Sequence, residues 1–364
     1  MCIRDRSNDI DLNDLFKPAY GAVILELLDA SAGEFLGFTT VDYTLEAEGK
    51  HIDLARLQEL WEAKLEPVFP YRKAGEFVPA LEHDCPANKR VAPAVRLATP
   101  RVIIPVFPGT NCEYDTARAF RRAGGDPHIL VLKNLSPADV AESCEALVKA
   151  IDASQIVMLP GGFSGGDEPD GSAKFITAFF RAPAVTEAVR DLLKNRDGLM
   201  LGICNGFQAL IKLGLVPYGD IVSMTAECPT LTFNTIGRHQ SRLVRTRVAS
   251  NLSPWLAKTE VGDMHTIAIS HGEGRFVASD DVLAQLKANG QIATQYVDEA
   301  GVPGMDLDVN PNGSLLAIEG ITSPDGRVFG KMGHSERYSN GTFVNVPGEK
   351  DQPLFAAGVE YFAA

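Results

Sequence analysis

A cysteine between two glycines is the first candidate for chemistry in this chain. Residues 202–206 read GICNG, follow an apolar run over residues 198–201, and precede a helical pattern that ends at Gly214. Cys204 is therefore predicted to lie on the sharp turn between a buried strand and a helix. The N-terminus of that helix favours the thiolate, which is the nucleophilic form of cysteine. The alternative is a buried cysteine that acts as a small apolar residue.

A cysteine nucleophile needs a base, and the base needs a group that orients it. The best candidates are His334 and Glu336 in the sequence GHSER, which follows a predicted strand at residues 328–330. His334 can take the thiol proton and later protonate a leaving amine. Glu336 can hold the imidazole in the right tautomer, because residues i and i+2 of an extended chain point the same way. A solvated polar turn is the alternative for this motif.

A glycine-rich loop follows a third predicted strand at residues 155–159. Residues 160–167 read PGGFSGGD, and the glycines at 161 and 162 allow backbone N–H groups to converge on an oxyanion. The chain contains neither the phosphate-binding motif GxxxxGK[ST] nor the dinucleotide motif GxGxxG. A simple tight turn is the alternative interpretation of the loop.

Two further motifs also end strands. His271 opens the sequence HGEGRF, but the PCxxC partner of zinc deaminases is absent, so we expect no metal there. The motif is predicted to be either a loop that lines the substrate site or a structural turn. Cys112 lies near a helix N-terminus and competes with Cys204 as nucleophile, but it lacks the flanking glycine pair. We interpret Cys112 as a lining or structural residue.

The elements that must position these residues alternate between strand and helix. This alternation over residues 101–213 predicts βαβ units, and therefore an α/β fold with a mostly parallel sheet. Such sheets bind ligands beyond the carboxyl ends of their strands, where Cys204 is expected. Beyond Pro217 the pattern becomes richer in strands, predicted at 242–249, 265–270, 292–297, 315–319 and 328–330.

The domain organisation is predicted from composition and periodicity. Residues 1–6 fit no pattern and are interpreted as an artefactual scar. Residues 7–72 carry candidate strands at 22–27 and 35–39 and a helix at 53–63, an α+β piece that is marginal for a core of its own. Residues 73–100 are rich in proline, alanine and mixed charge, which is typical of a linker. The main domain is expected to span residues 101–364.

Composition limits the kinds of partner. The chain has 364 residues, 45% hydrophobic residues and a net charge of −13, which argue for a globular protein without a general nucleic-acid or anionic-membrane surface. No apolar run reaches the length of a membrane-spanning helix, and no secretory signal is found. The six cysteines lack CxxC spacing, which predicts neither a disulfide framework nor a structural zinc site and fits a cytoplasmic location.

Five motifs in order resemble those of the class I glutamine amidotransferases, and among them the glutaminase domain of the phosphoribosylformylglycinamidine synthases, enzymes of purine biosynthesis. The resemblance runs from Arg101 to the end of the chain, and residues 60–71 resemble the carboxyl end of the synthetase half of those enzymes. The motifs are FPGTNC (107–112), LPGGFS (159–164), GICNGFQ (202–208), HGEGRF (271–276) and GHSER (333–337).

The resemblance implies a concrete activity. Cys204 would attack the side-chain amide of glutamine to give a glutamyl thioester and ammonia, with His334 and Glu336 completing the triad. Backbone N–H groups around Gly162 and Asn205 would form the oxyanion hole. The other residues expected to bind substrate are Gly161, Phe163, Gln208 and His271.

The resemblance also implies partners and cofactors. In the family enzyme, ammonia moves to a synthetase site and meets formylglycinamide ribonucleotide activated by ATP and magnesium, and the glutaminase domain itself needs no cofactor or metal. The body of the synthetase half is absent from this sequence, so residues 7–72 are expected to be its truncated tail. The loop after Ser164 also departs from many relatives, which have a bulky residue where Gly165 stands.

Two other functions remain open from the sequence. A cysteine hydrolase or protease of the flavodoxin-like class would share the cysteine elbow and the histidine. A docking domain that kept the fold and lost the chemistry is a non-enzymatic alternative. Glutamine offered beside peptides and esters would separate the two enzymatic functions, and the pH dependence of Cys204 reactivity would identify an inert module.

Overall fold

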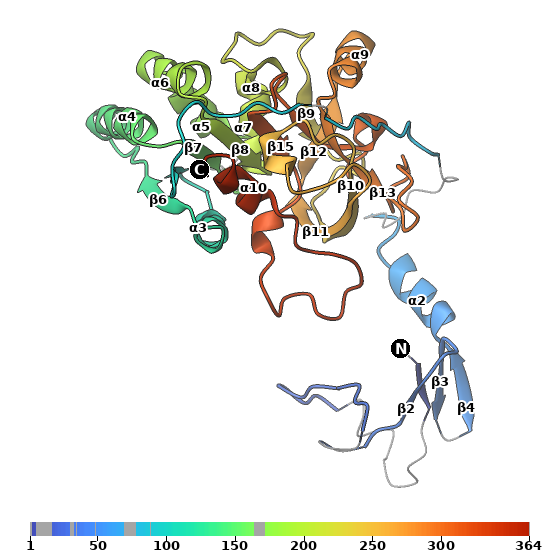
Figure 1. Ribbon diagram of the computed structural model, residues 1–364. Coiled ribbons are helices and arrows are strands. Elements are labelled where there is room, and N and C mark those ends of the chain that lie inside the picture. Colours follow the sequence, from blue (N-terminus) through green and yellow to red (C-terminus); the bar gives the residue numbers. More distant parts are fainter. Residues whose placement is uncertain are drawn as a thin grey trace. The chain divides into compact units, whose positions relative to one another are not determined.

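The structure of the protein is a computed structural model that forms two compact units, residues Met1–Lys73 and Ala74–Ala364 (Figure 1). The described residues are 2–4, 17–29, 33, 35–47, 49–68, 78–87, 89–163 and 172–363.

A nine-stranded sheet with the order β11-β10-β13-β14-β15-β8-β7-β5-β6 organises the larger unit. Its parallel half carries the expected βαβ units, and every residue of β7, β8 and β15 is buried. These strands therefore read as apolar runs rather than alternating patterns. The parallel strands are β5 (Arg101–Val106), β6 (Asp126–Val131), β7 (Ile156–Leu159), β8 (Leu199–Ile203) and β15 (Val328–Lys331).

The other half of the sheet is antiparallel, so the sheet is mixed. Its four strands account for the β-rich pattern that the sequence shows beyond residue 217. They are β10 (Gln240–Val248), β11 (Met264–His271), β13 (Ile292–Val297) and β14 (Ile318–Thr322). A separate two-stranded sheet pairs β9 (Thr230–Phe233) with β12 (Glu273–Val277).

Helices cover both faces of the parallel half, as right-handed crossovers require (Figure 1). One face carries α3 (Glu113–Arg122) and α10 (Leu354–Glu360), which meet through the edge-to-face rings of Phe120 and Phe355. The other face carries α4 (Pro137–Asp152), α5 (Lys174–Phe180), α6 (Pro183–Lys194) and α7 (Asn205–Leu213). The remaining helices are α8 (Leu215–Tyr218), α9 (Asp280–Ala288) and the 3-10 turns η1 (Pro254–Leu256), η2 (Leu315–Ala317) and η3 (Ser335–Arg337).

Local sequence explains where these helices begin. Ser136 caps α4, because its hydroxyl accepts a hydrogen bond from the N–H of Asp139 at 3.1 Å, and Pro137 occupies the first helical position. Pro183 separates α5 from α6, because proline cannot continue the first helix and suits the first position of the second. No helix in the described part of the chain is long and apolar enough to cross a membrane.

The smaller unit contains a four-stranded sheet in the order β2-β1-β3-β4 and one helix, α2 (Leu54–Ala63). Asp53 caps this helix by accepting a hydrogen bond from the N–H of Ala55 at 2.8 Å. None of the described residues from 17 to 68 is buried, which fits a piece too small for its own core. The strands are β1 (Cys2–Arg4), β2 (Phe38–Thr40), β3 (Thr44–Ala47) and β4 (Lys50–Asp53).

Two details of this unit concern segments that the sequence analysis named. The strand expected at residues 22–27 was wrong, because no described strand pairs with this segment and it has no regular structure. Cys2–Arg4, which lie within the segment interpreted as a scar, form β1 and pair with β2 and β3.

The segment before β5 crosses the larger unit as an extended chain (Figure 1). The N–H of Cys85 donates to the carbonyl of Ala249 at 2.9 Å, and the N–H of Leu97 donates to the carbonyl of Phe362 at 2.7 Å. The unit boundary accordingly falls at Ala74, so the described residues between 78 and 100 belong structurally to the larger unit.

Candidate active site

Four neighbouring parallel strands deliver the chemistry-bearing residues to one edge of the sheet. Strand β15 leads to His334 and Glu336, β8 leads to Cys204, β7 leads to Gly161, and β5 leads to Cys112. The strands end in register, since Lys331 pairs with Ile203 and Leu159 pairs with Gly202. Residues far apart in the sequence therefore meet beyond the carboxyl ends of adjacent strands.

Cys204 occupies the strained elbow that the sequence predicted. Its backbone has φ 54° and ψ −107°, a conformation that a residue with a side chain adopts only when its surroundings enforce it. Helix α7 approaches β7 so closely that a Cβ on Gly206 would lie 1.9 Å from the carbonyl oxygen of Leu159. The glycine is thus required for the helix to start directly after the nucleophile, with Asn205 in its first turn.

His334 and Glu336 form a buried hydrogen-bonded pair. Nδ1 of His334 lies 2.6 Å from Oε1 of Glu336, and the two side chains are 1% and 0% exposed. Burial disfavours the imidazolium, but the Glu336 carboxylate and the Cys204 sulfur outweigh it and raise the pKa of His334 well above its ordinary value. Burial likewise disfavours the carboxylate, but the His334 charge and hydrogen bond hold the pKa of Glu336 below its ordinary value. The pair therefore stabilises a charged imidazolium beside Cys204.

Gly161 lies against both His334 and Cys204. A Cβ built on Gly161 would lie 2.8 Å from Cε1 of His334 and 3.5 Å from Cβ of Cys204. The imidazole and Cys204 thus flank the same glycine, which leaves them room to approach. The structure therefore brings together Cys204, His334, Glu336 and Gly161, four residues that the sequence analysis assigned to one site.

A methyl group at this glycine tests the arrangement. We expect Gly161→Ala to lower kcat about 100-fold with little change in thermal stability, because the methyl group displaces the imidazole by a fraction of an ångström. Gly272→Ala is the matched control, since its Cβ would lie 3.9 Å from the nearest atom in the same pocket. Steady-state kinetics of both variants check this, and equal kcat values for the two would contradict it.

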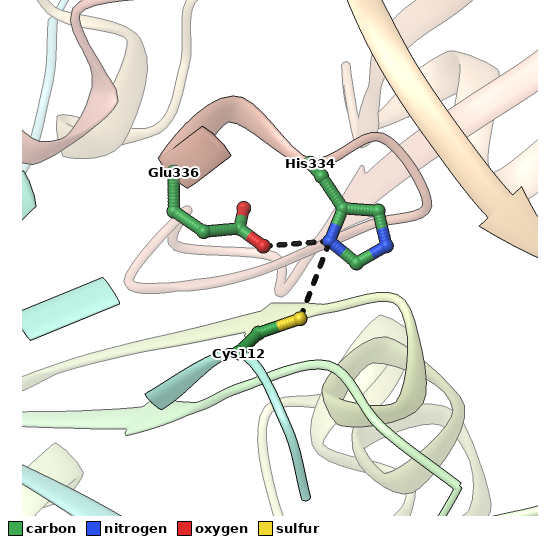
Figure 2. A group of neighbouring side chains, drawn as sticks. All are labelled: Cys112, His334 and Glu336. Atoms are coloured by element: carbon green, nitrogen blue, oxygen red, sulfur yellow. Dashed lines mark hydrogen bonds and ion pairs between the residues drawn. The ribbon is translucent and has the colours of Figure 1, made fainter. Parts of the chain in front are cut away.

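Cys112 touches the imidazole of His334, a contact that the sequence did not predict. Figure 2 shows Cys112 and Glu336 converging on the same ring nitrogen of His334, and the Sγ–Nδ1 distance is 3.9 Å. The guanidinium of Arg337 donates to this sulfur at 3.5 Å. Burial opposes the charge of Arg337, but the contact with Cys112 raises its pKa. Cys112 therefore forms part of the wall that holds the imidazole.

In the described part of the chain, one group of side chains could hold a metal ion: Cys112, His334 and Glu336. Ligand atoms of Cys112, His334 and Glu336 all lie within 4.8 Å of one another. However, Nδ1 of His334 is already engaged with Glu336, and the Arg337 cation lies at the cysteine sulfur. A divalent cation would be repelled by Arg337 and would break the pair that activates His334. The chemistry of the cluster thus favours proton transfer over metal binding.

A cavity of about 490 Å³ opens next to the nucleophile. Cys204 lines it together with four residues predicted to bind substrate: Gly162, Phe163, Gln208 and His271. Gly161 and Asn205 are not among the lining residues. Gly272 and Glu273 line the cavity and belong to the HGEGRF motif, which was predicted to be either a lining loop or a structural turn. The lining residues outside every motif that the sequence analysis named are Phe233, Gly237, Arg238, His239 and Ser270.

Hydrogen bonds hold the wall of this cavity. The amide of Asn205 donates to Oε1 of Gln208 at 2.8 Å, and Nε2 of Gln208 donates to the carbonyl of Glu273 at 2.5 Å. These contacts link α7 to β12, so the helix behind the nucleophile also fixes the far side of the cavity. The loop from Ser164 to Gly171, including Gly165, lies outside the described residues.

His271 is held neutral in this wall. Burial, followed by the charges of His334 and His239, lowers its pKa to about 3, and its ring contacts the side-chain amide of Asn312 at 3.2 Å. Because unfolded histidine titrates near 6.5, the unfolded state binds a proton below that pH and the folded state does not until about pH 3. The stability contributed by neutral His271 is therefore present above pH 6.5 and is lost as the pH falls toward 3.

This linkage predicts the acid stability of one variant. Between pH 6 and pH 4, we expect the free energy of unfolding of His271→Gln to fall less steeply than that of the unchanged chain. The two slopes should differ by about 1.4 kcal/mol per pH unit. Urea unfolding at several pH values measures both slopes. Identical slopes would show that His271 binds its proton equally in both states.

Comparison with known proteins identifies the family of this fold and site. Residues 99–362 match the model of the CobB/CobQ-like glutamine amidotransferase domain. The chain belongs to this family of glutamine amidotransferases. The family recognised from the five motifs is thereby confirmed, and so is the α/β class with a parallel sheet around the site.

Individual relatives agree with this membership. The chain is 32% identical over 288 residues to phosphoribosylformylglycinamidine synthase subunit PurQ of Methanococcus maripaludis, covering 72% of this chain and 97% of the relative. It is 36% identical over 236 residues to the PurQ subunit of Aquifex aeolicus, covering 64% and 89%. The structure of PurLQS from Thermotoga maritima matches with a TM-score of 0.51 and 27% identity, over 72% of this chain and 99% of that chain.

Proposed function

We propose that this chain supplies ammonia by hydrolysing glutamine for the phosphoribosylformylglycinamidine synthase reaction of purine biosynthesis. The observation that carries the proposal is the buried His334–Glu336 pair beside Cys204, which lines a cavity of about 490 Å³. The match to PurQ subunits over nearly their whole length supports the choice of pathway.

The proposed chemistry uses a Cys204–His334–Glu336 triad. Sγ of Cys204 attacks the side-chain amide carbon of glutamine, and His334 takes the thiol proton. His334 returns this proton to the leaving nitrogen, which departs as ammonia and leaves a glutamyl thioester. A water molecule then attacks the thioester carbon and gives a proton to His334. The carbon–sulfur bond breaks, His334 returns that proton to the sulfur of Cys204, and glutamate is released. In every step, the Glu336 carboxylate stabilises the protonated form of the His334 ring.

The oxyanion of each tetrahedral intermediate needs donors close to Cys204. Two backbone amides are proposed to supply them, those of Gly162 and Asn205. Gly162 lines the cavity beside Cys204, and Asn205 begins α7, where N–H groups of the first turn point away from the helix. Phe163, Gln208 and His271 are proposed to shape the site around the substrate.

The ammonia is proposed to pass to a cytoplasmic synthetase partner that binds formylglycinamide ribonucleotide, ATP and magnesium. The structure of PurLQS from Thermotoga maritima is a solved example of a chain of this fold in an assembly of that name. The glutaminase unit itself is proposed to work without a cofactor.

Transfer of labelled nitrogen tests the proposal. The chain is mixed with a purified synthetase that uses free ammonia, together with formylglycinamide ribonucleotide, ATP, magnesium and glutamine labelled with 15N in its amide. We expect 15N in the amidine product. If the synthetase works with ammonium chloride but gains nothing from this chain and glutamine, the proposed function is wrong.

A further inference from the structure

A fully buried lysine lies directly beneath the turn that carries the triad base. Lys331 is the last residue of β15, and both its side chain and that of its partner Glu319 are 0% exposed. Lysine is almost never fully buried unless it is paired, so this side chain needs a reason to be there. The chemistry described above does not use it.

All three donors of the Lys331 ammonium are engaged. Nζ lies 3.0 Å from the carbonyl oxygen of Gly333, 2.9 Å from the hydroxyl of Ser335 and 3.4 Å from Oε1 of Glu319. An ammonium group has three donors, so this set is complete. Two of the three acceptors belong to the residues on either side of His334.

Glu319 holds the same turn from the other side of the lysine. Its Oε1 accepts a hydrogen bond from the N–H of Gly333 at 2.6 Å, and its Oε2 accepts one from the hydroxyl of Thr294. A Cβ on Gly333 would lie 2.9 Å from Oε1 of Glu319 and 3.2 Å from Nζ of Lys331, so the turn rests directly on the ion pair. Ser335 extends the network by donating to Oε1 of Gln352 at 2.7 Å.

The backbone of Lys331 is hydrogen-bonded to the backbone of Cys204, the proposed nucleophile. Its carbonyl oxygen accepts the N–H of Cys204 at 2.9 Å. The side chain of Lys331 therefore contacts the two residues that flank His334, and its main chain contacts Cys204. A shift of either element has to move the other.

We propose that Lys331, paired with Glu319, is a positioning residue that sets the relative placement of Cys204 and His334. The inference rests on the proposed function and adds a residue to its machinery. Burial lowers the pKa of Lys331, and the charges of Glu319 and Glu336 oppose that shift. The contacts of Lys331 and Glu319 with Gly333 and Ser335 thus fix the geometry of the turn that carries His334.

The test separates positioning from simple stabilisation. Lys331→Met leaves Glu319 buried and unpaired, so a loss of melting temperature is expected for that variant. The double variant Lys331→Met/Glu319→Gln removes both charges and keeps an acceptor for the N–H of Gly333. We expect the melting temperature of the double variant to be close to that of the unchanged chain. We expect its kcat to be about 100-fold lower than that of the unchanged chain, and its KM for glutamine to differ by less than about threefold. Lys258→Met is the matched control, since Lys258 pairs with Glu360 on the surface.

A second readout does not depend on glutamine. The rate at which iodoacetamide alkylates Cys204 is followed against pH in the unchanged chain and in the double variant. We expect slower alkylation near neutral pH in the double variant, because the imidazolium no longer sits beside the sulfur. If the unchanged chain fails to hydrolyse glutamine, the proposed function fails, while this comparison still decides the role of Lys331.

A milder variant covers the case in which both lysine variants unfold. Ser335→Ala removes one acceptor of Lys331 and introduces no buried charge. We expect kcat to fall about tenfold and the melting temperature to fall by less than in Lys331→Met, because one donor of Lys331 loses its partner while both charges stay paired. Well-folded double and Ser335→Ala variants that both show the kcat and alkylation profile of the unchanged chain would overturn the proposal.

Discussion

Replacing Cys204 by alanine is expected to abolish glutamine hydrolysis, with kcat lower by about 10⁵-fold or more, while the fold stays intact. The side chain is 5% exposed at the floor of the cavity, and the strained elbow gives it no other evident task. The thioester cannot form without the sulfur, and no other thiol borders the cavity among the described residues. Ammonia release from glutamine measures the effect.

The control for this variant is another cysteine. Cys144 lies on α4, away from the site, and burial raises the pKa of its thiol. Cys144→Ala should therefore keep the activity of the unchanged chain. If Cys204→Ala still hydrolyses glutamine, another residue must be the nucleophile, and Cys112 would be the first to examine.

Replacing Glu336 by glutamine is expected to lower kcat by roughly 10³- to 10⁴-fold. The amide is nearly the same size, so the change removes the charge that outweighs burial at His334. The pKa of His334 should then fall, because burial alone disfavours the imidazolium. In Glu336→Gln the imidazolium is consequently lost at a lower pH than in the unchanged chain.

The pH dependence of Cys204 alkylation checks the sign of this effect. In the unchanged chain, the raised pKa of His334 keeps an imidazolium beside the sulfur as the pH rises past 6.5. In Glu336→Gln, the enhanced alkylation near neutral pH should disappear, and reaction should require a higher pH. An unchanged alkylation profile would mean that Glu336 does not set the charge of His334.

The sequence predicted the site well where local chemistry dictates local structure. The glycines around Cys204 specify a strand–helix elbow. His334 and Glu336 meet as expected, but a 3-10 turn over Ser335–Arg337 brings them together and not the extended chain on which the prediction rested. The parallel strand order follows from the βαβ alternation, so meeting at one edge of the sheet was expected. Even the conformation of Cys204, with φ 54°, is one that the elbow motif implies.

The sequence did not predict the parts that depend on pairing over long distances. Phe233 reaches the cavity because β9 pairs with β12, opposite Glu273, and alternation identifies strands without naming their partners. The burial of Lys331 and Glu319 could not be foreseen, since charged residues in isolation predict exposure. The contact between Cys112 and His334 likewise depends on strands β5 and β15, which are separated by β7 and β8 in the sheet.

The most direct test of the account is to locate the thiol that glutamine reaches. The unchanged chain is incubated with a chloroketone analogue of glutamine, digested, and mapped by mass spectrometry, with excess glutamine as a competitor. The account predicts a single adduct on the peptide that contains Cys204, and protection of that peptide by glutamine. An adduct on Cys112 instead, or labelling that glutamine does not suppress, would contradict it.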